Sequence, residues 1–74
     1  MLLEGVDGGV SAFHERLAAI MAERGITQAE LARQMGMHRV TAHNWYWGMT
    51  EPSIEKLIRL RRILHCEWDE LLGR

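Results

Sequence analysis

Two short predicted helices joined through a glycine constrain the fold of this chain more than any other feature. Thr27 and Glu30 have the spacing of a capping box, in which the hydroxyl and the carboxylate each accept a hydrogen bond from a backbone N–H at a helix start. A helix is therefore expected to begin at about Gln28. It ends at Gly36, because glycine adopts the left-handed backbone conformation that turns the chain sharply. A further helix over residues 39–47 follows almost at once.

Apolar spacing predicts one helix before this pair and two after it. Residues 1–10 contain three glycines and little periodicity, so we expect a flexible lead-in there. From Ser11, apolar residues recur every three or four positions until Gly25 ends the helix; these are Phe13, Leu17, Ile20 and Met21. Ser53 is placed to cap a helix with a broad apolar face and a basic polar side. That face consists of Ile54, Leu57, Ile58, Leu60, Ile63 and Leu64. Glu67 to Leu72 predicts a last short helix.

These segments indicate one all-α domain over residues 11–74, a compact bundle of about five short helices that contains a helix-turn-helix. A chain of 74 residues forms one domain at most. No apolar run approaches the roughly 18 residues that a membrane span needs, and the N-terminus lacks the basic start of a secretory signal. The single cysteine, Cys66, cannot form an internal disulfide, which fits a reducing compartment. We therefore expect a cytoplasmic protein without a membrane partner.

The ionisable residues do not indicate catalysis or metal binding. The four histidines are scattered along the chain, with no suitably placed nucleophile or paired carboxylate. His65 and Cys66 are adjacent, and adjacent helical residues point in different directions, so they do not form a metal pair. The sequence predicts a protein that is not an enzyme and binds no cofactor. The net charge of -1 also argues against a polycation that coats nucleic acid without specificity.

The predicted helix over residues 39–47 separates into a polar arc and a buried arc when its residues are placed at about 100° each. Arg39, Val40, His43, Asn44 and Trp47 share one arc of roughly 140°. The opposite side holds Thr41, Ala42, Trp45 and Tyr46, and Trp45 is expected in the core. Two short helices joined by three or four residues pack at a steep angle, so that the second can enter a DNA major groove. The sequence thus predicts a DNA-reading helix.

Several features together resemble the lambda-repressor-like helix-turn-helix family of phage repressors and Cro proteins. The resemblance covers about Phe13 to Leu72. Its matching features are Thr27-Gln28, Leu31-Ala32, Gly36, Trp45, Gly48, Pro52-Ser53 and Asp69-Glu70-Leu71-Leu72. It implies base contacts by Arg39, Val40, His43 and Asn44, and a phosphate contact by Gln28. Further candidate contacts to the DNA backbone are Thr27, His38, Trp47, Thr50, Ser53 and Lys56.

This chain departs from the family at two places. An arginine late in the first helix and a glutamate near the end of the third are common in relatives, and Met21 and Tyr46 stand there instead. Since apolar groups often replace a buried ion pair without loss of stability, we expect Met21 to contact Tyr46. The loop after Gly48 lacks the basic residues frequent in relatives, which predicts a shallow salt dependence of DNA binding. Arg59, Arg61 and Arg62 are expected on a solvated helix face.

The leading hypothesis is a sequence-specific regulator of transcription that binds double-stranded DNA, most simply a repressor acting as a homodimer on an operator. Trp68 and Leu72 of the last helix are candidates for the dimer contact. Two alternatives stay open. One is an antitoxin that binds both its operator and a toxin. The other is a protein-interaction module that keeps the fold and has lost DNA binding, for which the acidic balance and Glu51 argue.

Overall fold

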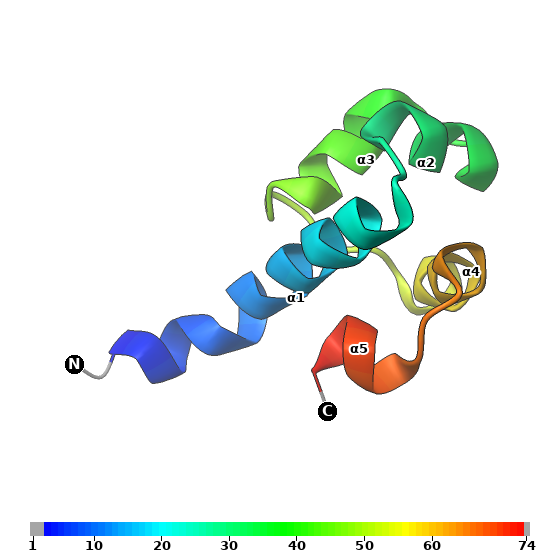
Figure 1. Cartoon of the computed structure of the whole chain (residues 1–74). Coiled ribbons are helices and arrows are strands. Elements are labelled where there is room, and N and C mark those ends of the chain that lie inside the picture. The colour runs from blue at the N-terminus through cyan, green and yellow to red at the C-terminus, as the bar shows by residue number, and fades with distance from the viewer. Residues whose placement is uncertain (1–2, 74) are drawn as a thin grey trace.

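A computed structural model describes the chain from residue 3 to residue 73, with side chains from residue 13 onward. These residues form five helices and no strand (Figure 1). The helices are α1 (Leu3–Arg24), α2 (Gln28–Met35), α3 (Arg39–Tyr46), α4 (Ile54–Leu64) and α5 (Trp68–Leu72). In Figure 1, α2 and α3 lie together above α1, whereas α5 lies below it. The predicted all-α bundle is confirmed, and none of the described helices is long and apolar enough to cross a membrane.

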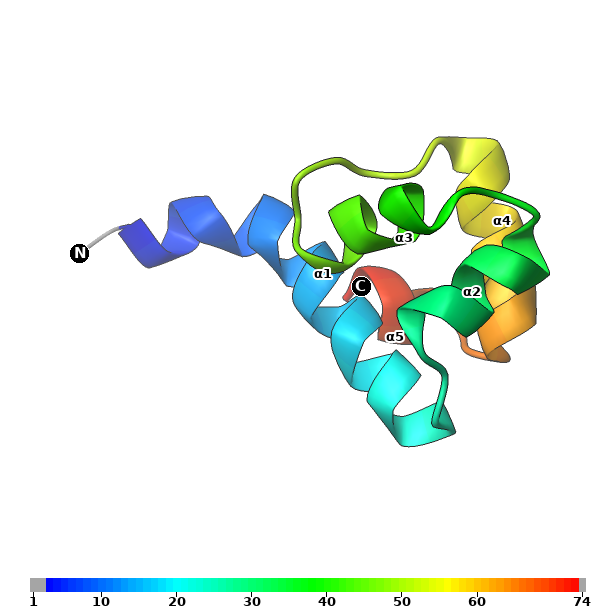
Figure 2. The same cartoon turned by 90° about the horizontal axis from the view of Figure 1, so that it is seen from above.

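The start of α1 is the main error of the sequence prediction. The helix begins at Leu3 and not at Ser11, and its first turns project away from the other helices (Figure 2). Leu3, Val6 and Val10 continue the three- and four-residue apolar spacing of the helix, but the three glycines among them have low helix propensity and favoured the prediction of a flexible lead-in. Residues 1 and 2 of the predicted lead-in lie outside the described part of the chain.

The core lies where α1 meets the other four helices. Leu17 of α1, Leu31 of α2, Leu60 of α4 and Leu71 of α5 are fully buried, and Trp45 of α3 is 3% exposed. Each helix therefore contributes its apolar stripe to one shared cluster. The core position predicted for Trp45 is confirmed.

The apolar face predicted for α4 is only partly buried. Leu60 and Leu64 lie in the core, and Leu57 and Ile63 pack against it. Ile54 and Ile58 are exposed instead, because they lie on the opposite edge of the stripe, where no described helix covers them. The apolar face expected on α4 is thus covered by the bundle at four of its six residues and open at these two.

Glycines end the first two helices as predicted. Gly25 follows α1 with a φ of 67°, and Gly36 follows α2 with a φ of 68°. Met37 N–H donates to the Ala32 carbonyl at 3.0 Å across the second of these turns. This hydrogen bond satisfies a carbonyl that the helix end would leave unpaired. The joint between α2 and α3 consists of residues 36–38 alone, which fixes the two helices relative to each other.

The cap of α2 is half of the predicted capping box. Thr27 Oγ1 accepts a hydrogen bond from Glu30 N–H at 3.1 Å, as predicted. The Glu30 carboxylate does not return to the Thr27 backbone and accepts hydrogen bonds from Arg33 and Gln34 instead. A guanidinium one turn away competes with the backbone N–H because charge-assisted hydrogen bonds are the stronger ones. The side-chain hydrogen bond between Arg33 and Glu30 favours the charged form of both groups. It therefore lowers the pKa of the Glu30 carboxyl and raises the pKa of the Arg33 guanidinium.

Arg59 and Arg62 of α4 are exposed, as expected for a solvated basic face, whereas Arg61 is half-buried. The Arg59 guanidinium donates to the Met35 carbonyl at 2.9 Å and so caps the end of α2. Arg61 lies over the Trp68 ring, 5.1 Å from its centroid, in a cation–π contact between α4 and α5. The long arginine side chains reach neighbouring elements, which helical spacing does not reveal.

Candidate DNA-binding surface

One side of α3 faces outward and the other is built into the core. Arg39, Val40 and His43 are exposed, with Val40 at 61%. Ala42 and Trp45 on the opposite side are buried and anchor the helix to the bundle. The two arcs expected from the sequence therefore have the expected exposure at these positions. A helix held this way can present side chains to a DNA groove without exposing its apolar face.

Asn44 lies at the edge of the exposed side and is half-buried. Its backbone carbonyl accepts hydrogen bonds from Met49 N–H at 2.8 Å and from Thr50 N–H at 3.4 Å. The loop after α3 is thus folded back onto the helix, and Thr50 is exposed on it. Asn44 and the loop residues are therefore neighbours.

Aromatic rings cover the end of α3. The helix ends at Tyr46, one residue earlier than predicted, and Trp47, which is 59% exposed, directly follows it. Its ring packs edge-on against Tyr46, with centroids 5.3 Å apart, and lies 6.4 Å from the ring of His43. His14 of α1 donates from Nδ1 to the Tyr46 carbonyl at 3.2 Å. The exposed indole of Trp47 is therefore held in place by neighbours that are themselves fixed to the bundle.

The start of α2 is the second part of the surface. Thr27 caps the helix, and because its oxygen accepts from the backbone, its own O–H stays available as a donor. Gln28, the first residue of α2, is half-buried. The first N–H groups of a helix lack intrahelical partners, and the helix dipole makes this end positive. A phosphate is the kind of group that such an end binds.

The remaining candidate backbone contacts fall into two groups. His38 precedes α3, is exposed and makes no capping hydrogen bond with its side chain, so its imidazole is not used by the fold. Ser53 caps α4 by accepting from Lys56 N–H at 3.3 Å. Lys56 itself is half-buried in the first turn of α4. His38 and Ser53 are exposed, whereas less of the Lys56 side chain is accessible.

Permanent positive charge is sparse on this surface. Arg33 is paired with Glu30, and its charge is thereby offset. Arg39 has no ion-pair partner among the described residues and is exposed. The loop adds the exposed Glu51 instead of a cation. Lys and Arg side chains bind DNA phosphates irrespective of base sequence, and this surface has few of them.

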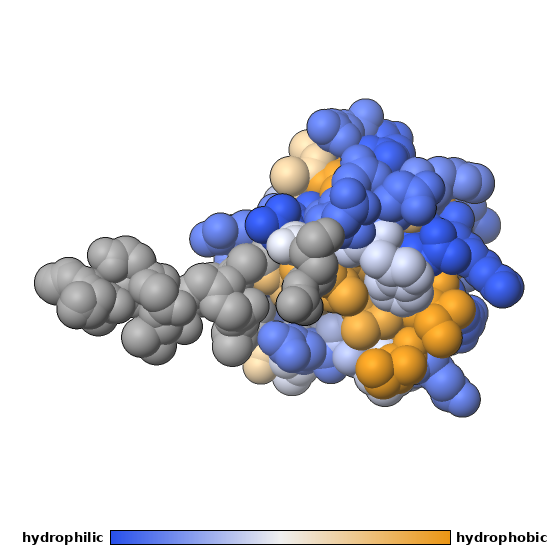
Figure 3. Space-filling view, turned by 90° about the horizontal axis from the view of Figure 1, so that it is seen from below, coloured by the Kyte–Doolittle hydropathy of each residue, from blue (hydrophilic) through white to orange (hydrophobic). Residues whose placement is uncertain are grey.

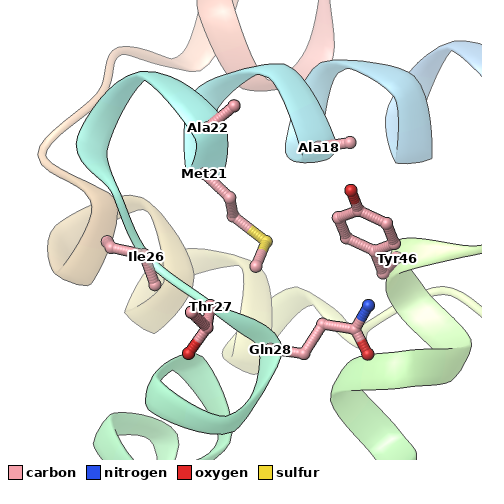
Figure 4. Close-up of a pocket in the computed structure, with 7 residues that line it drawn as sticks. All are labelled: Ala18, Met21, Ala22, Ile26, Thr27, Gln28 and Tyr46. Carbon is pink, nitrogen blue, oxygen red and sulfur yellow. The ribbon is translucent and has the colours of Figure 1, made fainter.

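A hollow of about 220 Å³ opens between α1, the start of α2 and the end of α3 (Figure 4). We call it the α1–α2 hollow. It is lined by Ala18, Met21, Ala22, Ile26, Thr27, Gln28 and Tyr46. Met21 and Tyr46 thus come to one site, as the alignment of the first helix with the family requires. The space beside them shows that this pair does not fill the volume between the helices. Tyr46 was assigned to the buried arc, so helical spacing missed its place at this opening.

Two short helices with a tight joint, the second exposing a polar stripe, define a helix-turn-helix DNA-binding domain. The family comparison agrees: residues 16–74 match the model of the Cro/C1-type helix-turn-helix DNA-binding domain, and the chain belongs to this family. It is 36% identical over 58 residues to the repressor protein C2 of Salmonella phage P22. That match covers 78% of this chain and 27% of the phage protein.

A solved structure shows the same fold. It is the crystal structure of a transcriptional regulator from Listeria innocua, with a TM-score of 0.75 and 35% sequence identity. The match covers 84% of this chain and 58% of the Listeria chain. Both relatives are therefore longer proteins, of which this chain corresponds to a part. The family is defined by DNA binding, and the names of both relatives describe regulators.

Proposed function

We propose that this chain is a sequence-specific regulator that binds double-stranded DNA and represses transcription by occupying an operator as a homodimer. The observation that supports this most is the exposed stripe on α3, held by a rigid helix-turn-helix joint in a member of the Cro/C1-type family. The similarity to a phage repressor favours repression over activation.

The base contacts are assigned by side-chain chemistry. Arg39 presents paired donors that match guanine O6 and N7, and Asn44 can pair with adenine. Val40 places an exposed branched side chain where it can contact a thymine methyl, and His43 lies one turn further along the same face. Each well-formed bidentate contact contributes about 1 to 3 kcal/mol of discrimination between bases.

The backbone contacts are assigned to the rim of the reading helix. Gln28 and Thr27 at the positive end of α2 are the central pair. His38, Trp47, Thr50, Ser53 and Lys56 surround α3 and complete the set of candidates. These contacts fix the register of the domain on the duplex and do not read sequence.

Selection of bound fragments from a genomic library tests this function directly. The wild-type domain is titrated against the fragments at low and moderate salt, and the best fragment is tested again with Arg39→Ala and Asn44→Ala. We expect both variants to lose affinity for that fragment, whereas Arg62→Ala, an exposed arginine on α4, serves as the control. Full binding by both α3 variants contradicts the assignment of α3. If no specific fragment emerges, the protein-interaction alternative replaces DNA binding.

The dimer contact is proposed on an apolar face made by α4 and α5 (Figure 3). Ile54 is 72% exposed, and Ile58, Trp68 and Leu72 are each about 40% exposed. Phe13 and Leu57 line a cavity of about 180 Å³ beside Leu72. Exposed apolar groups gathered on one face mark interaction sites. A second copy of the chain is the occupant we propose, because paired half-sites would compensate for the sparse positive charge.

Sedimentation of the domain over a range of concentrations tests this contact. Ile58→Glu is expected to shift the protein toward monomer because it places a charge in the contact. Ala19→Glu, at an exposed position on α1, is expected to leave the oligomeric state unchanged. A wild-type chain that stays monomeric both free and on a two-half-site duplex contradicts the proposed dimer.

A further inference from the structure

The α1–α2 hollow combines an apolar floor with a polar rim. Met21 at its floor is 2% exposed, and Ala18 and Ala22 form a low wall along α1 because their side chains end at Cβ. Thr27, Gln28 and Tyr46 stand at the rim. Figure 4 shows the Gln28 amide turned toward the tyrosine ring and the Tyr46 hydroxyl on the side of α1. The rim therefore offers an amide and two hydroxyl groups over a shallow space.

The polar rim is suited to an anionic group. None of the seven lining residues is acidic. Glu30 N–H is taken by Thr27, and Leu31 N–H donates to the Thr27 carbonyl, so the first two N–H groups of α2 are the ones left over near the rim. The Gln28 amide and the Tyr46 hydroxyl can each donate a further hydrogen bond. Hydrogen bonds from such donors to a charged oxygen are stronger than those between neutral groups.

Tyr46 is held in one orientation. Its carbonyl accepts from His14, and its ring meets the edge of Trp47 at an interplanar angle of 76°. It is also the last residue of α3, the helix whose other end begins with Arg39. A DNA strand that contacts the start of α2 while α3 lies in the major groove would therefore pass the Tyr46 hydroxyl, whose position is already fixed. Binding there would cost little side-chain entropy.

We propose that Tyr46 is a further DNA-backbone contact. Its hydroxyl and the Gln28 amide hold one phosphate of the operator strand, and the adjoining sugar lies over the hollow between Ala18 and Ala22. This inference rests on the proposed DNA-binding function and adds a residue to it. It also gives Tyr46 a role beyond its packing beside Met21 at the hollow.

Tyr46→Phe tests the contact because it removes the hydroxyl and keeps the ring. We expect roughly a ten- to hundredfold loss of affinity, the size of one hydrogen bond to a charged group. The loss should be equal for the selected operator and for an unrelated duplex of the same length, since a phosphate contact does not read sequence. Arg39→Ala, by comparison, should weaken binding to the operator more than binding to the unrelated duplex, because it removes a base contact. A methylphosphonate at the contacted phosphate should weaken binding by Tyr46→Phe less than binding by the wild type, because the variant keeps only the Gln28 part of the contact.

A second pair of variants tests the hollow itself. Ala22→Leu fills it and is expected to weaken DNA binding, whereas Ala19→Leu on the same helix lies in a different groove, against α5, and serves as the control. Thermal unfolding checks that all variants are folded. Unchanged affinity of Tyr46→Phe, or a loss of affinity for the operator alone, overturns this inference. The proposed function still stands in that case if Arg39→Ala weakens binding to the operator. A wild-type domain that binds no duplex overturns both.

Discussion

Gly48 passes directly against the imidazole ring of His14: a Cβ built on this glycine would lie 2.6 Å from Cδ2 of the histidine. The same imidazole donates to the Tyr46 carbonyl at the end of α3. Because a carbonyl only accepts, Nδ1 of His14 is the protonated nitrogen. Two features favour a glycine where the chain leaves α3. One is this close contact, and the other is the positive φ of 77° at Gly48.

Gly48→Ala should therefore destabilise the domain more than Gly36→Ala. Both glycines have positive φ, which costs an alanine roughly 1–2 kcal/mol. Only at Gly48 must the added methyl also displace a ring, since nothing lies within 4 Å of a Cβ at Gly36. We expect an additional loss of about 1 kcal/mol or more in the free energy of unfolding, measured with urea. In a His14→Ala background the difference between the two variants should shrink, and equal losses in the native background would rule out the steric cause.

His65→Gly should stabilise the domain. His65 ends α4 with a φ of 53°, the only positive φ of a non-glycine residue in the described chain. Arg24 fixes this turn by donating to the carbonyls of Leu64 at 2.9 Å and of His65 at 3.0 Å, and neither bond uses the imidazole. Glycine removes the strain of the left-handed conformation, and we expect a gain of roughly 0.5–1 kcal/mol. Thermal unfolding measures it, with His38→Gly as a comparison at an extended position. A lower midpoint for His65→Gly would show that the imidazole has a stabilising role.

Cys66 should make stability fall at alkaline pH. The side chain is 3% exposed, and desolvation, together with the nearby Glu70 carboxylate, raises the pKa of its thiol. The unfolded chain then loses the thiol proton at a lower pH than the folded chain does. The stabilisation is complete below the pKa of the unfolded thiol and is lost as pH rises through the folded value. Urea unfolding from pH 7 to pH 10 should show this loss, and Cys66→Ala should show less of it. Rapid reaction of the native thiol with a disulfide reagent would contradict its burial.

The affinity for the operator should depend only weakly on salt. Each phosphate that a cation neutralises contributes about 0.9 to the slope of log affinity against log salt. Arg39 is the exposed cation of α3, and Arg33 is engaged by Glu30. Glu51→Lys, in the loop after α3, should steepen the slope by about one and raise the affinity for any duplex. Filter-binding or fluorescence titrations at several salt concentrations measure the slope. A steep slope for the wild type would mean that phosphates are neutralised elsewhere.

The parts of the fold predicted from the sequence are those set by local chemistry. Thr27 and Ser53 cap the helices that follow them, and Gly25 and Gly36 end the helices before them, as expected. The buried Trp45 and the exposed Val40 follow from helical spacing alone. These features depend on neighbouring residues or on a single helix, which is why a pattern reveals them.

The errors come from contacts between distant segments. Helical spacing did not reveal that Arg59 reaches the end of α2 from α4, across the bundle. Ile54 and Ile58 continue the apolar stripe of α4 beyond the width that the other helices cover. Tyr46 belongs to the inward arc of α3, yet the small alanines of α1 leave it at an opening. Periodicity counts apolar residues on a face and does not measure how much of that face a neighbour hides.

The joint of residues 36–38 has a consequence for how a duplex must fit this domain. Its backbone hydrogen bond across Gly36 and the burial of Ala42 and Trp45 oppose a tilt of α3 separately from α2. When the groove of a given operator differs in width or curvature, the adjustment falls to the DNA. In the proposed complex, base pairs that no side chain touches then influence affinity through their stiffness, so flexible steps between the two half-sites of the proposed dimer become part of the recognised sequence.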